Sequence, residues 1–64
     1  MSDPTALYLY ERSMLHKRNA ERLLSEVSPS GHAVVSELRA MVKYLELGIA
    51  KQREEIDEQL RDSV

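Results

Sequence analysis

Apolar residues recur every three or four positions along two segments of this 64-residue chain, and Ser28-Pro29-Ser30-Gly31 separates the segments. On a helix this spacing places the apolar side chains on one face. The pattern predicts two amphipathic helices, at about residues 4–27 and about 33–61, joined by a turn over residues 28–32. A connection this short is typical of antiparallel neighbours. We therefore expect an all-α, two-helix antiparallel hairpin that forms a single domain over residues 1–64.

The first helix has a predicted start and a predicted apolar face. Asp3 is expected to cap the free N–H groups, and Pro4 suits the first helical position because its missing N–H has no partner there. The face that the periodicity predicts is Leu9, His16, Ala20, Leu23, Leu24 and Val27, with Ala6 and Ser13 beside them.

The second helix carries the most regular apolar pattern. As a heptad it places β-branched residues at a and Leu or Gln at d. The a positions are Val35, Val42, Ile49 and Ile56, and the d positions are Leu38, Leu45, Gln52 and Gln59. This stripe is predicted to pack on the first helix, with Val35 facing Val27 and Val42 facing Ala20. The second helix is expected to be about six residues longer, so that its acidic end overhangs from Glu58.

The short chain predicts association. It has no cysteine to supply a disulfide, and small domains without such constraints usually need a partner. We expect a homodimer of hairpins forming a four-helix bundle, or a helical complex with another protein. Gly48, inside the second helix, is interpreted either as a point of close approach by another helix or as a tolerated defect. The predicted interface residues are Leu7, Tyr10, Met14, Met41, Leu45, Gly48 and Gln52.

Charge and composition narrow the functional classes. Nine basic and eleven acidic residues give a net charge of −2, which disfavours a general nucleic-acid or membrane-surface binder. The longest apolar run, residues 6–10, is far shorter than the ~20 residues of a membrane span. Asp3 and the lack of a basic N-terminal stretch predict no secretory signal. A cytoplasmic protein without membrane contact is expected.

No catalytic, cofactor or metal site is predicted, and neither is a small-molecule substrate. His16 lies on the apolar face, where it is either a pH-sensitive or metal-binding group, or a packed ring whose nitrogen bonds a carbonyl or water. The second interpretation is favoured, because Ser13 and Ala20 occupy the positions where further ligands are needed. The acidic run near Glu55 is interpreted as a solvated helix end or as a surface that docks a basic partner. The chain is not expected to be an enzyme.

Three basic residues of the first helix support an alternative function. Arg12, Arg18 and Arg22 could contact phosphates from one face. In length and expected architecture alone, the chain resembles Rop-like hairpin proteins, which implies a nucleic-acid-binding regulator as the alternative. In architecture it is also similar to the hairpin co-chaperones of bacterial secretion systems. The favoured function is a small protein–protein interaction module, acting as adaptor, regulator or chaperone-like subunit. A dimerisation or docking domain of a longer protein is the third hypothesis.

Overall fold

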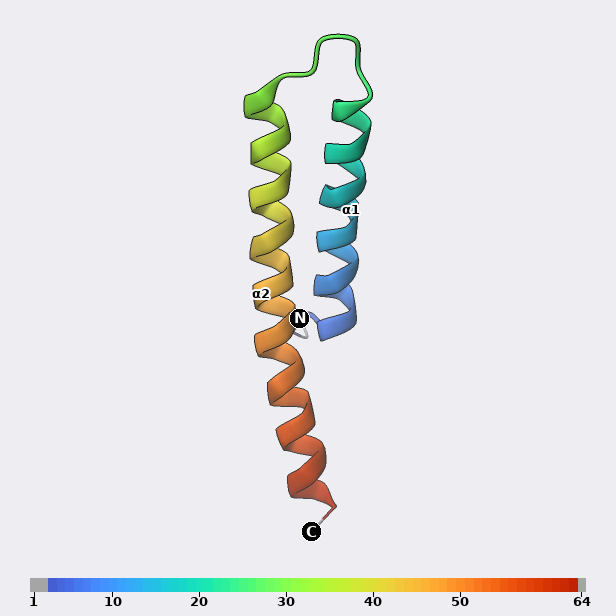
Figure 1. Cartoon of the computed structure of the whole chain (residues 1–64). Helices are drawn as coiled ribbons and strands as arrows, with labels where there is room; N and C mark the ends of the chain where they lie inside the picture. The colour runs from blue at the N-terminus through green and yellow to red at the C-terminus, as the bar shows by residue number, and fades with distance from the viewer. Residues whose placement is uncertain (1–2, 64) are drawn as a thin grey trace.

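The computed structural model describes residues 3–63, which form two antiparallel helices lying side by side (Figure 1). Helix α1 comprises Ala6–Leu24 and helix α2 comprises Gly31–Asp62. The described residues contain no strand. The predicted all-α hairpin is confirmed, although the helix boundaries and the faces that meet differ from the prediction.

Helix α1 begins two residues later than predicted, because Thr5 caps it and Asp3 does not. The Thr5 hydroxyl accepts a hydrogen bond from the backbone N–H of Tyr8 over 3.2 Å, which is the usual N-cap arrangement. The Asp3 carboxylate instead lies 4.0 Å from the ammonium of Lys51 on α2. Pro4 therefore precedes the cap and does not occupy the first helical position.

The connection between the helices spans residues 25–30, so α1 ends three residues earlier than predicted. The backbone N–H of Glu26 bonds the Leu23 carbonyl, an i→i−3 bond that tightens and ends the last turn. Val27 consequently lies outside the helix and is wholly exposed. Helix α2 begins at Gly31, two residues earlier than predicted, because the Ser30 hydroxyl caps it through the N–H of Ala33.

Small side chains of α1 line the seam, the strip along which the two helices meet. Ala6, Ser13 and Ala20 recur every seven residues, and all three are buried, with Ser13 and Ala20 only 1% and 2% exposed. Val34 and Gly48, fourteen residues apart, are the buried residues of α2. The two helices approach closely because these side chains are short. The α2 residues along the seam are Val34, Glu37, Met41, Tyr44, Gly48, Lys51 and Glu55.

The stripe of α2 that was predicted to pack on α1 differs from the observed seam by one heptad position. Val35, Val42 and Ile49 were expected to pack on α1, yet each is about half exposed. Val27 and Val35 do not form the expected pair, since both are exposed. The physical reason is that the closest approach is between small side chains, so Val34 and Gly48 face α1 and the β-branched stripe is rotated away from it.

Helix α2 is longer than α1 by more than predicted, with 32 residues against 19. The start of α1 lies level with Glu55, whose carboxylate accepts the N–H of Ala6 over 2.8 Å. The segment from Ile56 to Asp62 therefore projects beyond α1 (Figure 1). We call it the overhang; it begins two residues before the predicted Glu58.

Candidate functional site

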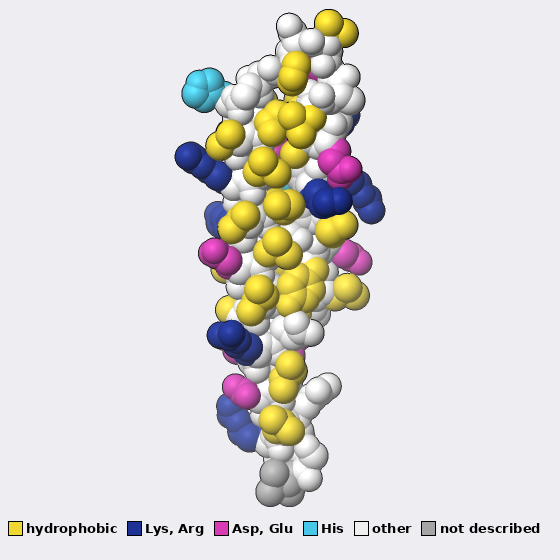
Figure 2. All heavy atoms as spheres, in the orientation of Figure 1, with side chains coloured by type: hydrophobic (Ala, Val, Ile, Leu, Met, Phe, Trp, Pro, Cys, Tyr) yellow, Lys and Arg dark blue, Asp and Glu magenta, His cyan; other side chains and the backbone are white. Residues whose placement is uncertain are grey.

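One broad side of the hairpin is apolar across both helices. Figure 2 shows apolar side chains running along this side, with charged side chains at its edges. We call it the apolar face. Its α2 residues are Val35, Leu38, Val42, Leu45, Ile49 and Ile56, and its α1 residues are Leu7, Tyr10 and Met14. All of them are exposed except Tyr10 and Leu45, which are half-buried. The α2 residues that sequence analysis assigned to the hairpin's interior thus lie on an exposed apolar surface.

Tyr10 joins the two halves of the apolar face. Its hydroxyl donates a hydrogen bond to Oε1 of Gln52 over 2.6 Å, and its ring lies against Gly48. A Cβ on Gly48 would lie 2.7 Å from the ring carbon Cε1, closer than real contacts allow. The glycine predicted to admit another helix therefore admits a ring of the same chain. Gln52 thus finds a hydrogen-bond partner within the hairpin.

The seven predicted interface residues divide into two groups. Tyr10 contacts both Gly48 and Gln52 within the hairpin, and Met41 and Leu45 are half-buried. Leu7 and Met14 are exposed and share a shallow surface hollow with Tyr10, Glu11, Leu15 and Arg18. Only the second group is wholly available to a partner. Val35, Leu38, Val42 and Ile49 were not among the predicted interface residues, because their perfect heptad suggested burial within the hairpin.

The opposite side of the hairpin carries a polar cluster around His16. Its Nδ1 lies 2.6 Å from Oε2 of Glu37, and its ring stacks on Tyr44 with 5.5 Å between centroids. The guanidinium of Arg12 lies 5.4 Å from the same Tyr44 ring, a cation–π distance. Asn19 also donates to Glu37 over 3.4 Å. His16 is therefore a packed ring, as the favoured interpretation held, but its partner is a carboxylate and not a carbonyl or water.

The Glu37 carboxyl has a pKa below its ordinary value of 4.5. The hydrogen bond from His16 is the largest cause, and the Asn19 amide and the charges of His16 and Arg22 act in the same direction. Desolvation opposes them by favouring the neutral acid. The folded chain thus binds the Glu37 proton more weakly than the unfolded chain, so this group stabilises the hairpin above the ordinary glutamate range.

Glu37→Gln is expected to flatten the acid side of the stability profile. In the native chain the contribution of Glu37 is present above about pH 4.5 and is lost as the pH falls through the lowered pKa. Glutamine keeps an acceptor for His16 but does not titrate. Thermal unfolding by circular dichroism from neutral to acid pH measures this. Glu58→Gln, an exposed change on the overhang, should follow the native profile; a native-like slope for Glu37→Gln would contradict the assignment.

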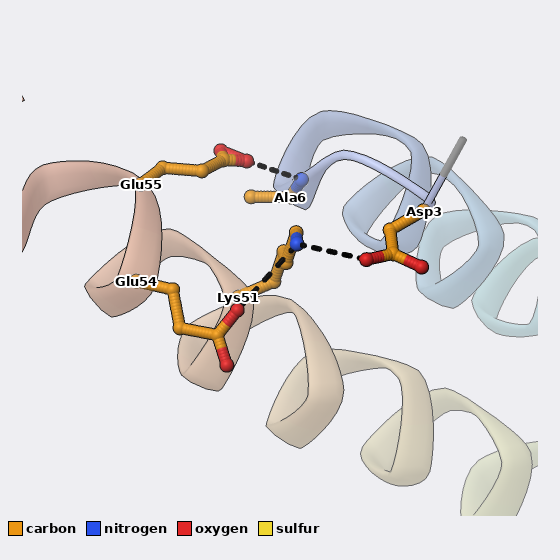
Figure 3. Close-up of polar contacts among 5 residues, drawn as sticks. All are labelled: Asp3, Ala6, Lys51, Glu54 and Glu55. Carbon is orange, nitrogen blue, oxygen red and sulfur yellow. Dashed lines mark hydrogen bonds and ion pairs between the residues drawn. The ribbon is translucent and has the colours of Figure 1, made fainter. Parts of the chain in front are cut away.

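A second polar cluster fixes the start of α1 against α2 (Figure 3). The Glu55 carboxylate accepts the N–H of Ala6, and negative charge there also suits the positive end of the α1 dipole. Lys51 lies between Asp3 and Glu54, at 4.0 Å and 3.5 Å from their carboxylates. Two members of the predicted acidic run thus have contacts within the hairpin, and the cluster holds the start of α1 against α2.

The three arginines of the nucleic-acid hypothesis lie in different surroundings. Arg12 contacts Tyr44 in the polar cluster. Arg22 is exposed and adds positive potential at Glu37. Arg18 borders the hollow on the opposite flank, beside Met14. The structure does not gather the three side chains around one feature.

The described residues contain neither a candidate metal-binding cluster nor a candidate membrane-spanning helix. Residues 3–63 contain no group of three or more His, Cys, Asp or Glu side chains that could hold a metal ion. Within the same range, neither helix combines the length and the apolar character needed to cross a bilayer.

The comparisons with known proteins add no family. No protein-family model, curated protein or solved structure matches this chain.

Proposed function

We propose that this chain is a non-enzymatic protein–protein interaction module whose apolar face packs against another helical surface. The observation that carries the proposal is the exposure of that face. Val42 and Ile49, for example, are 46% and 47% exposed at the middle of α2, where a helix of a soluble bundle ordinarily buries such residues.

The hairpin buries little apolar surface of its own. Its buried apolar residues are Ala6, Leu9, Ala20 and Val34, and two of these are alanines. Burial of apolar area is the main force that stabilises a small domain. A contiguous apolar surface that stays in water contributes nothing to that force, and such surfaces usually mark an interaction site. Covering the apolar face is therefore expected to stabilise the hairpin as well as to perform its function.

A photo-crosslinking experiment tests the proposal in the cells that produce the protein. A benzophenone amino acid at Val42 is expected to form covalent adducts with a protein that covers the face. The matched control carries the same amino acid at Lys43, an exposed position about 100° further round the same turn of α2. We expect severalfold more adduct from position 42. Equal yields from the two positions would contradict an interaction through the apolar face.

A further inference from the structure

The apolar face has a charged edge that the hairpin itself does not use. Arg39, Glu46 and Arg53 follow one another at seven-residue intervals, immediately after the d positions Leu38, Leu45 and Gln52. They lie on the side of α2 away from α1, which contacts the other side of the stripe through Val34 and Gly48. All three are exposed, and none is in an ion pair within residues 3–63. Figure 2 shows charges of both signs along this edge.

We propose that the partner of the apolar face is a second copy of this chain, with the two α2 helices antiparallel about a two-fold axis crossing them between Lys43 and Tyr44. The inference rests on the function proposed above and specifies the partner. In this arrangement the numbers of residues that face each other add up to 87. A two-fold interface closes on itself, so assembly stops at the dimer.

The register places apolar residues opposite one another. Val42 faces Leu45 of the second copy, and Leu38 faces Ile49 of the second copy. Symmetry repeats both pairs, which gives four apolar layers. Leu38 also lines a shallow hollow together with Val35, Arg39 and Val42. Ile49 of the second copy therefore enters this hollow as a knob enters a hole.

Charge selects this register among its neighbours. In antiparallel packing the residues after the d positions approach each other across the interface. Here Arg39 meets Glu46 of the second copy, and Glu46 meets Arg39. Moving the second copy by one heptad toward the overhang keeps four apolar layers. However, Arg39 then approaches Arg53 of the second copy, and the two Glu46 side chains approach each other. A shift of one heptad toward the connection sets Arg39 against Arg39. Like charges at such contacts oppose binding, so both shifts are disfavoured.

A shift of two heptads toward the overhang has fewer apolar layers. It pairs Glu46 with Arg53 of the second copy, which is favourable. However, Ile49 then faces Gln52, and only the layers of Leu45 with Ile56 remain apolar on both sides. The register centred between Lys43 and Tyr44 is the one that combines four apolar layers with complementary charges.

The antiparallel direction follows from the position of α1. Val or Ile at a with Leu at d is typical of parallel pairs, in which g residues pair with e residues of the partner. In this hairpin the g positions Val34, Met41 and Gly48 lie along the seam with α1 and carry no charge. An antiparallel pair instead joins the two charged edges directly. The charge pattern therefore favours the antiparallel arrangement.

The same axis brings together other exposed apolar residues. His16 of α1 lies level with Tyr44, on which it stacks, so the axis crosses α1 between His16 and Lys17. Leu7 then lies within one turn of Leu24 of the second copy, and both are exposed. The overhang reaches past α2 of the second copy, which places Leu60 beside the connection that contains the wholly exposed Val27.

The overlap is large enough for a stable dimer. Residues 31–56 of both α2 helices overlap, which is about 38 Å of helix at 1.5 Å per residue. Two helices side by side are about 20 Å wide, so the face covered on each copy is on the order of 750 Å². A standard protein–protein interface covers about 800 Å² per partner.

Charge reversal tests the register with the full chain. Arg39→Glu and Glu46→Arg each turn two attractive contacts into repulsive ones, and each is expected to weaken the dimer about tenfold in sedimentation equilibrium. A 1:1 mixture of the two variants restores both attractive contacts in a heterodimer. We expect its dissociation constant to return to within about threefold of the native one. Lys43→Glu, a charge reversal off the interface, is the control, and helical content by circular dichroism checks the fold.

Each other outcome overturns the inference in a recognisable way. Tighter dimers of Arg39→Glu indicate the shifted register that sets residue 39 against Arg53. Unchanged dimers of both variants indicate another interface, and failure of the mixture to recover excludes the paired contacts. A native chain that stays monomeric at every concentration excludes self-pairing. Adducts from position 42 with a different protein would, in that case, leave the proposed function standing.

Discussion

Gly48→Leu is expected to separate the two helices and to lower the free energy of unfolding by roughly 3 kcal/mol. A Cβ at this position already lies 2.7 Å from Tyr10 Cε1, and leucine adds three further carbons in the same direction. The ring cannot swing away freely, because its hydroxyl is bonded to Gln52. At about 4–8 °C per kcal/mol for a domain of this size, the melting temperature should fall by more than about 10 °C.

A double-mutant cycle with alanine separates the effect of the contact between Tyr10 and Gly48 from the effect of helix propensity. Gly48→Ala alone gains about 1 kcal/mol of propensity but displaces Tyr10, so we expect a net loss of stability. In a Tyr10→Ala background the obstruction is gone, and the same Gly48→Ala change should stabilise by about 1 kcal/mol. Gly31→Ala is the control, since no atom lies within 4 Å of its Cβ position. Thermal unfolding at one fixed protein concentration measures all four variants; additive effects at positions 10 and 48 would refute the contact.

Ser13→Leu is expected to have the second large effect and to lower the free energy of unfolding by about 3 kcal/mol. Ser13 is 1% exposed and lies between Ala6 and Ala20 in the strip of small residues where the helices meet. Leucine finds no space there, and overpacking a close helix contact forces the backbones apart.

Ser13→Ala is the matched control for this prediction. The Ser13 hydroxyl bonds the Tyr10 carbonyl of its own helix, so its removal leaves no partner unpaired between the helices. We expect a change within about 1 kcal/mol, because alanine fits the space and favours the helix. Denaturation by urea gives both values. A Ser13→Leu variant as stable as Ser13→Ala would show that the seam lies elsewhere.

The polar contacts between the two helices were not predicted from the sequence. Glu37 and Tyr44 surround His16, and Glu55 caps α1 from the other helix. Glu55 was expected to belong to a solvated or partner-docking helix end, and the apolar periodicity gave Glu37 and Tyr44 no contact with α1. Glu37 and Tyr44 share a seven-residue spacing with Lys51, and Glu55 lies seven residues after Gly48. A pattern built on apolar positions does not count polar residues, so it did not reveal this spacing. The polar residues opposite His16 were the signal from which these contacts could have been predicted.

The number, type and order of the elements were determined by the sequence alone. Apolar spacing of three and four, a stretch without Gly or Pro, and the break around Pro29 suffice for an antiparallel helical hairpin, because these are local properties of the backbone. The overhang also followed from the unequal lengths of the two periodic segments, although its first residue did not.

Only the tertiary structure decided which side of α2 meets α1. Two stripes of α2 share the seven-residue period: a purely apolar one through Val35 and Val42, and a mixed one through Val34 and Gly48. Hydrophobicity alone selects the first. The helices pack through the second because Ser13, Ala20 and Gly48 permit the closest approach, and because Tyr10 and Glu55 find hydrogen-bond partners there. The strongest apolar pattern in the chain is thereby left on the surface, where we propose that it forms the interaction site.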